Sequence, residues 1–148
     1  MNSRIIVNGL GYLGLTPFII SCFLALRDQM LFDYDGAFLF TGYSAVILSF
    51  LGGTLWGIAL PLPKGVASVN LLIISNLIAL SAWVALLLSS AGYKAVLLML
   101  VLGYMTTLTV ELQYRSILSA GTGVAYAGFR VTLTSMVVLL HLLLIVYL

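Results

Sequence analysis

Charged side chains are spaced so widely in this sequence that most of the chain has to lie in lipid. The 148 residues include six Lys or Arg and four Asp or Glu, so 7% are charged, whereas soluble domains typically carry about 25%. A spanning helix needs about 20 mostly apolar residues. Uncharged runs close to or above that length lie between Arg4 and Arg27, Asp35 and Lys64, Lys64 and Lys94, Lys94 and Glu111, and from Val131 to Leu148.

These runs predict an all-α fold, an integral membrane bundle of five transmembrane helices in one domain. The expected spans are about 9–27, 37–60, 67–90, 94–114 and 130–148. The fourth span reaches full length only if its helix continues past Glu111. No segment is long and polar enough for a soluble domain.

The stretch RIIVNGLGYLGL near the N-terminus contains a literal G-x-G-x-x-G, formed by Gly9, Gly11 and Gly14. This motif indicates a dinucleotide site only within a βαβ unit that belongs to a sheet. The apolar composition excludes that context. We therefore expect these glycines to ease helix packing at the start of the first span.

Basic residues favour a cytoplasmic N-terminus and a C-terminus on the far side, although the bias is modest. Five spans place Arg4, Lys64, Arg115 and Arg130 on one side, and Arg27 and Lys94 on the other. The longest linker, residues 116–129, is rich in small residues and predicts a re-entrant or interfacial segment.

Small residues form a stripe along the second span at intervals of four. Gly53 and Gly57 make a G-x-x-x-G, a pattern that lets another backbone approach closely. The simplest interpretation is a packing seam inside the monomer, and the alternatives are an oligomer seam or a ligand slot. The helix-packing residues of this stripe are Ala45, Ser49, Gly52, Gly53 and Gly57.

Glu111 is the one carboxylate inside a predicted span. A charge in a membrane is costly and usually faces the bundle interior with a partner. Arg115 lies one helical turn later, and Arg130 begins the last span at a similar depth. We therefore expect a buried ion pair of Glu111 with Arg115 or Arg130, and the alternative is a proton or cation site.

His141 is the single histidine, and it falls near the centre of the last span. A neutral histidine that is hydrogen-bonded to a neighbouring helix is the favoured interpretation, over a proton relay or metal ligand. Asn76 in the third span lies at a comparable depth and is a possible partner. Thr107, in line with Gly103 and Glu111, completes the intramembrane polar positions.

The sequence contains no recognisable catalytic motif, neither a nucleophile elbow nor a Walker loop nor a zinc-binding HExxH. We therefore predict no catalytic residues, no metal site and no cofactor. The absence of a basic patch excludes nucleic acid as a partner. The expected partners are the lipid bilayer and either another membrane protein or a second copy of the chain.

Three stretches resemble a small bacterial and mitochondrial membrane family of unknown function, which includes transmembrane protein 69 in animals. The resemblance covers LGYLGLTPF, YSAVILSFLGGTLWG and YAGFRVTLT, in this order along the chain. It implies an inner-membrane helical protein with five spans. The resemblance supplies no reaction.

Together these features predict a non-enzymatic inner-membrane protein that acts through helix packing. It would serve as an accessory or assembly subunit of a membrane complex, or form a homo-oligomer. The alternative is a small transporter or channel whose polar path runs near Glu111, His141 and Asn76.

Overall fold

The computed structural model describes residues 3–114 and 124–148, and nearly all of them are helical. Two short strands lie between the first two long helical segments. The elements, in chain order, are α1 (Ser3–Leu13), α2 (Thr16–Leu26), β1 (Met30–Leu31), β2 (Tyr34–Asp35), α3 (Gly36–Ala59), α4 (Val66–Leu87), η1 (Ser89–Ala91), α5 (Tyr93–Gln113) and α7 (Val124–Tyr147).

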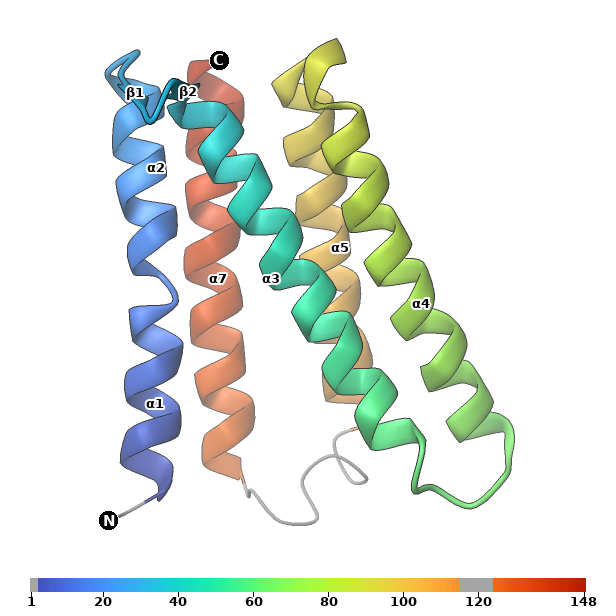
Figure 1. The fold of residues 1–148 in the computed structure, drawn as a ribbon. Coiled ribbons are helices and arrows are strands. Elements are labelled where there is room, and N and C mark those ends of the chain that lie inside the picture. The colour runs from blue at the N-terminus through green and yellow to red at the C-terminus, as the bar shows by residue number, and fades with distance from the viewer. Residues whose placement is uncertain (1–2, 115–123) are drawn as a thin grey trace.

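Five helical segments of the described chain are long and apolar enough to cross a membrane, which confirms the predicted all-α membrane bundle. The segments are Asn8–Leu26, Gly36–Ala59, Val66–Leu87, Tyr93–Gln113 and Ala127–Tyr147. The N- and C-termini lie at opposite ends of the bundle, as an odd number of crossings requires (Figure 1).

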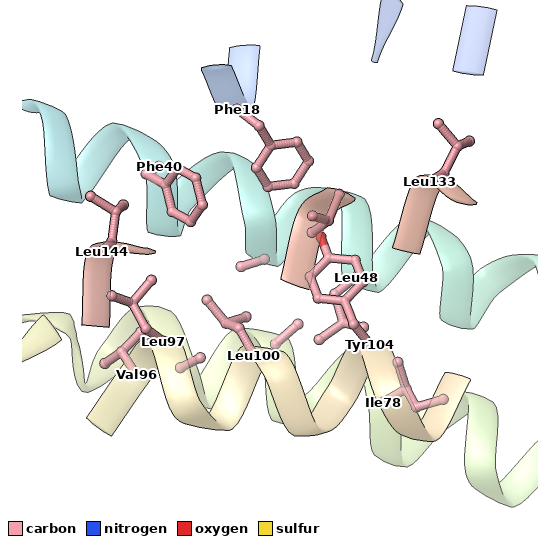
Figure 2. Packing of buried hydrophobic residues seen from close by; sticks show 14 of the residues in the cluster. Phe18, Phe40, Leu48, Ile78, Val96, Leu97, Leu100, Tyr104, Leu133 and Leu144 are labelled. Carbon is pink, nitrogen blue, oxygen red and sulfur yellow. The ribbon is translucent and has the colours of Figure 1, made fainter. Parts of the chain in front are cut away.

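The long helix α3 runs diagonally through the bundle and joins its two sides (Figure 1). It packs against α2 on one side and against α4 and α5 on the other, while α7 packs against α5 and α2. Side chains from these helices meet in one apolar core, in which Phe40 and Leu144 lie toward one end, Tyr104 and Ile78 toward the other, and Phe18 between them (Figure 2).

Three glycines allow helices to approach within contact distance. A Cβ atom on Gly36 would collide with the backbone of Ala25, so the start of α3 lies directly against the end of α2. A Cβ on Gly52 would lie 2.9 Å from the carbonyl oxygen of Ser75, which brings α3 and α4 together. Gly103 leaves room for the side chain of Leu48 in the same way.

The first span is broken at Gly14 and Leu15 into α1 and α2. Pro17 explains the break, because proline has no N–H to donate and its ring clashes with the preceding turn. The chain turns through a tighter bond from the Leu15 N–H to the Tyr12 carbonyl. The Tyr43 hydroxyl of α3 donates a 2.9 Å hydrogen bond to the Gly14 carbonyl, so the break is fastened to the bundle.

A short β-hairpin, whose strands have two residues each, connects α2 to α3. The sequence indicated only a linker here. Its turn residues, Phe32 and Asp33, both have positive φ angles, of 52° and 64°, as the tight hairpin turn that matches strand twist requires. Asp35 ends the hairpin and accepts a 2.8 Å hydrogen bond from the Phe38 N–H, so it caps α3. Its second carboxylate oxygen accepts a 2.8 Å bond from the Tyr93 hydroxyl of α5.

The last helix begins earlier than expected. α7 starts at Val124, so the second part of the predicted 116–129 linker is helical rather than re-entrant. Residues 116–123 of this linker lie outside the described residues. The other helix ends agree with the predicted spans to within a few residues, the usual uncertainty for helix boundaries.

Candidate functional site

His141 lies fully buried at the centre of the bundle, held by hydrogen bonds on both ring nitrogens. Its Nδ1 is 2.8 Å from the carbonyl oxygen of Val137, one turn earlier in α7. A carbonyl only accepts, so Nδ1 carries the hydrogen and the ring is neutral when Nε2 acts as acceptor. Nε2 is 2.8 Å from the Ser44 hydroxyl of α3, and this hydroxyl donates when the ring is neutral. The contact with Ser44 therefore links His141 of α7 to a neighbouring helix.

Aromatic rings enclose His141 on the sides where it makes no hydrogen bond. The Phe40 ring lies edge-on with its centre 4.7 Å away, and the Tyr104 and Phe18 rings lie at 5.5 and 6.1 Å. The Tyr104 hydroxyl donates a 2.9 Å bond to the Ser44 carbonyl, so serine, tyrosine and histidine form one network across α3, α5 and α7.

The suggested pairing of His141 with Asn76 is wrong. Asn76 is exposed on α4, and its side-chain amide donates a 2.8 Å bond to the Leu72 carbonyl of its own helix. The two residues do not meet, because α4 packs on α3 and α5 rather than on α7. Sequence position gives the depth of a residue in the membrane and not the direction in which its side chain points.

Glu111 and Arg130 form the predicted ion pair through two parallel hydrogen bonds. The Arg130 Nε donates to one carboxylate oxygen at 2.9 Å and Nη2 donates to the other at 3.0 Å. Each side chain is 11% exposed, so the pair is largely shielded while it lies near one end of α5 and α7. The two-point geometry fixes the guanidinium plane and joins the two helices. Arg115, the other expected partner, lies outside the described residues.

Thr107 is buried on the face of α5 that also carries Gly103. Its hydroxyl donates a 2.8 Å bond to the Gly103 carbonyl, one turn earlier in the same helix. The threonine thus satisfies its polar group locally, which is a common solution inside membranes.

The small-residue stripe on α3 divides between two faces of the helix. The prediction of one packing seam along the whole stripe inside the monomer is therefore wrong. Ala45 and Gly52 are buried, and Ser49 is half-buried. Gly53 and Gly57 are exposed, and a Cβ atom on either would meet nothing within 4 Å. The close approach to α4 is made by Gly52, which the G-x-x-x-G spacing does not include. The alternative of a seam with another chain stays a prediction for Gly53 and Gly57.

A partly open pocket of about 170 Å³ lies at the junction of α1 and α2. Most of its lining residues belong to α1, α2, α3 and α7. We call it the kink pocket. Its walls are mainly apolar, and its polar side chains are those of Tyr104, Arg130 and Thr134. The remaining lining residues are Leu10, Gly11, Gly14, Leu15, Phe18, Ile47, Phe50, Leu51, Leu133 and Val137.

The glycines of the G-x-G-x-x-G motif lie in and just after α1, within a helical span and not in a strand–helix unit. A Cβ on Gly11 would collide with the Phe129 ring of α7, so this glycine serves helix packing. Gly9 has open space around it. Within residues 3–114 and 124–148, no three His, Cys, Asp or Glu side chains gather as metal ligands.

Sequence reasoning missed Ser44 and Tyr104 as partners of His141. Both residues lie within predicted spans, and such positions carry a usable signal, because a buried hydroxyl in lipid has to find a partner. The kink pocket was missed as well, although Pro17 inside the first span indicated where that helix breaks.

The five apolar helices and the bonds between them define a multi-pass helical membrane protein. Residues 4–146 match the model of a family described as "Protein of unknown function (DUF3429)", and the chain belongs to that family. Neither a curated protein nor a solved structure matches the chain.

Proposed function

We propose that this chain is a non-enzymatic membrane protein that works through helix contacts, as an accessory or assembly subunit of a membrane complex or as a homo-oligomer. The observation that carries the proposal is the unfilled glycine face of α3. A Cβ atom added to Gly53 or Gly57 would have no neighbour within 4 Å. Glycine in a helix interior costs about 1 kcal/mol relative to alanine, and close packing with another helix offsets that cost.

The intramembrane polar residues support the same proposal, because the chain uses them to hold itself together. Both ring nitrogens of His141 and both carboxylate oxygens of Glu111 have partners within the bundle. Groups that are already paired in this way act as structural fasteners between helices.

The alternative proposal, a small transporter or channel, needs a polar path near Glu111, His141 and Asn76. Asn76 is exposed on the outer face of α4, whereas His141 is buried behind aromatic rings. These three residues therefore do not line a common path in this conformation. A pH-dependent flux in vesicles that is lost in Glu111→Gln would favour transport over helix packing.

Association is tested by purifying the full chain from membranes in mild detergent and measuring the mass of the particle and its stoichiometric partners. We expect a complex of fixed composition that contains either a second copy or another membrane protein. Gly53→Leu and Gly57→Leu should dissociate it without unfolding the chain. Gly128→Leu is the matched control, because Gly128 of α7 is also exposed and has open space around it. A monomer with no fixed partner would contradict the proposal.

The location and relatives of the chain are part of the same proposal. The charge distribution supports a bacterial inner membrane protein with its N-terminus in the cytoplasm. The resemblance of the YSAVILSFLGGTLWG stretch supports a relationship to transmembrane protein 69. Reporter fusions to each end test the orientation, and the N-terminal fusion should report the cytoplasm while the C-terminal fusion reports the far side.

A further inference from the structure

The kink pocket combines mainly apolar walls with the polar side chains of Arg130 and Thr134 from α7. We infer that it binds one acyl chain of a membrane lipid, with the ester carbonyl of that chain held by Thr134 and Arg130. This inference goes beyond the proposed helix-packing function and does not depend on it.

Thr134 is the first observation that points to a ligand. It is 4% exposed and lines the pocket. Its hydroxyl makes no hydrogen bond to another described residue, whereas Thr132 of the same helix donates to the Gly128 carbonyl at 3.0 Å. Within the described chain no fully buried side-chain oxygen lacks a partner, so the Thr134 oxygen keeps some exposed surface. A hydroxyl in this position is free to donate to a bound acceptor.

The broken first span is the second observation. Irregular backbone at membrane depth occurs where it is buried in protein or lines a cavity. Here the break at Gly14 and Leu15 forms one wall of the pocket. The Tyr43 hydroxyl satisfies the Gly14 carbonyl, so the break persists as a stable feature of the wall.

The shape of the pocket fits a chain that enters from the bilayer. Leu10 of α1 and Phe50 of α3 line it and are 62% and 65% exposed, so they form a rim that faces lipid. In the half of the bundle that contains the N-terminus, α3 slants away from α1 (Figure 1). An apolar cavity of about 150 Å³ holds a benzene-sized molecule, so the pocket encloses a segment of about six carbons.

Depth and charge favour the ester carbonyl as the group that Thr134 and Arg130 contact. Arg130 lies near the start of the span Ala127–Tyr147, close to the membrane surface, and Val137 lies deeper. A lipid lying in this direction has its ester groups near Arg130 and its chain toward Val137. The carboxylate of Glu111 neutralises Arg130 and occupies two of its five N–H groups. The remaining N–H groups therefore suit a neutral acceptor better than a second anion.

The test compares the full chain in vesicles of diester phosphatidylcholine and in vesicles of the diether lipid with the same chains, each with a trace of diester phosphatidylcholine that carries a photoreactive diazirine at mid-chain. Irradiation followed by peptide mass spectrometry shows which residues the chain touches. We expect labelling at Phe18 and Val137 to exceed labelling at Val146, which is exposed to lipid on the same helix as Val137. Unlabelled diester lipid should compete better than the diether lipid with the same chains, because the ether lacks the carbonyl.

Two matched pairs of variants make the assignment specific. Thr134→Val should reduce the advantage of the diester over the diether competitor by about two- to tenfold, the effect of one hydrogen bond. Thr132→Val should leave it unchanged. Val137→Phe fills the pocket and should suppress labelling at Phe18, while Val146→Phe should not. Circular dichroism confirms that each variant is folded, and Thr134→Val decides the outcome if Val137→Phe is not.

Three results would overturn the inference. The first is labelling spread evenly over pocket and lipid-facing residues. The second is equal competition by diester and diether lipids in the wild-type chain. The third is a Thr134→Val variant that keeps the full preference for the diester. Dissociation of a complex by Gly53→Leu has no bearing on any of them, so this inference and the proposed function can fail separately.

Discussion

The hydroxyl of Ser44 and the Nε2 atom of His141 lie 2.8 Å apart at the centre of the bundle, although 97 residues separate them in the sequence. This hydrogen bond joins α3 to α7, beside the contact of the Phe40 ring with the His141 ring. Interhelical hydrogen bonds in membranes contribute about 0.6 kcal/mol on average and up to about 1.7 kcal/mol. Because both partners are fully buried, the bond between Ser44 and His141 belongs near the upper end of that range.

We expect Ser44→Ala to lower the free energy of unfolding by about 1–2 kcal/mol, because it leaves the buried His141 Nε2 without a donor. A double-mutant cycle with His141→Phe isolates the pair. The second substitution should cost less in the Ser44→Ala background than in the wild type. Reversible unfolding in mixed detergent micelles measures each free energy.

Ser21→Ala is the control for this cycle. Ser21 is also buried, but its hydroxyl donates to the Pro17 carbonyl of its own helix at 2.6 Å. We expect Ser21→Ala to show no coupling with His141→Phe. Additive costs for Ser44→Ala and His141→Phe would mean that the hydrogen bond contributes nothing to stability.

The comparison of sequence and structure at His141 shows what hydropathy can predict. The position of a polar residue within an apolar run fixes its depth, because the helix rises by a constant 1.5 Å per residue. Its need for a hydrogen bond follows because the lipid around it, unlike water, offers no hydrogen-bonding partner. Its partner depends on how the helices pack, and α3 crosses the bundle diagonally, which no periodicity in the sequence indicates. Asn76 therefore falls within a predicted span but is exposed on α4, away from His141.

Gly52 and Gly53 provide a second prediction, since they are neighbours with opposite surroundings. Gly52→Ala would place a Cβ 2.9 Å from the Ser75 carbonyl oxygen, and we expect it to cost about 1–3 kcal/mol through overpacking of α3 on α4. The Cβ atom that Gly53→Ala adds has open space around it. This substitution should stabilise the monomer by up to about 1 kcal/mol, because alanine favours the helix over glycine. Thermal unfolding in mild detergent compares the two variants.

Opposite signs for these two substitutions are the decisive observation. Equal destabilisation by both would show that Gly53 packs within the monomer, as the G-x-x-x-G spacing predicts. The sequence indicates that this part of α3 approaches another helix, which is correct at Gly52. It does not distinguish the face toward α4 from the adjoining face, because Gly52 and Gly53 differ by one residue and so point about 100° apart on a helix of 3.6 residues per turn.

Asp35 supports a third prediction, because one carboxylate both caps α3 and binds Tyr93 of α5. Asp35→Ala removes both contacts, and we expect it to cost about 1–2 kcal/mol in the free energy of unfolding. Asp35→Asn keeps an oxygen for the cap and should cost less. Tyr93→Phe removes only the second contact, and Tyr34→Phe, at an exposed tyrosine of the hairpin, is its control. Urea or detergent titration of the four variants gives the order.

If Asp35→Asn lowered the free energy of unfolding as much as Asp35→Ala, the cap would be unimportant, because asparagine keeps an oxygen that can cap α3. The sequence offers a partial signal here, since Asp and Gly side by side before an apolar run are typical of a helix start. The hairpin before it was missed because its turn residues are Phe32 and Asp33, and tight hairpin turns usually carry Asn and Gly. The two short strands pair because the end of α2 and the start of α3 hold them together, where Gly36 lies against Ala25.

The last prediction concerns the ion pair of Glu111 and Arg130, which holds α5 to α7. Removing one partner leaves the other charged in a medium of low dielectric constant. Arg130→Leu leaves the short side chain of Glu111 without a partner, and we expect a loss of up to about 3 kcal/mol. Glu111→Gln should cost about 1 kcal/mol, because the amide oxygen still accepts one hydrogen bond and the long arginine stem can reach the membrane surface. The double variant Glu111→Leu with Arg130→Leu should recover most of the loss, since it leaves no charge behind. Unfolding free energies in detergent test this order, and a double variant less stable than Arg130→Leu alone would mean that the two leucines pack poorly and that charge is not what governs this contact.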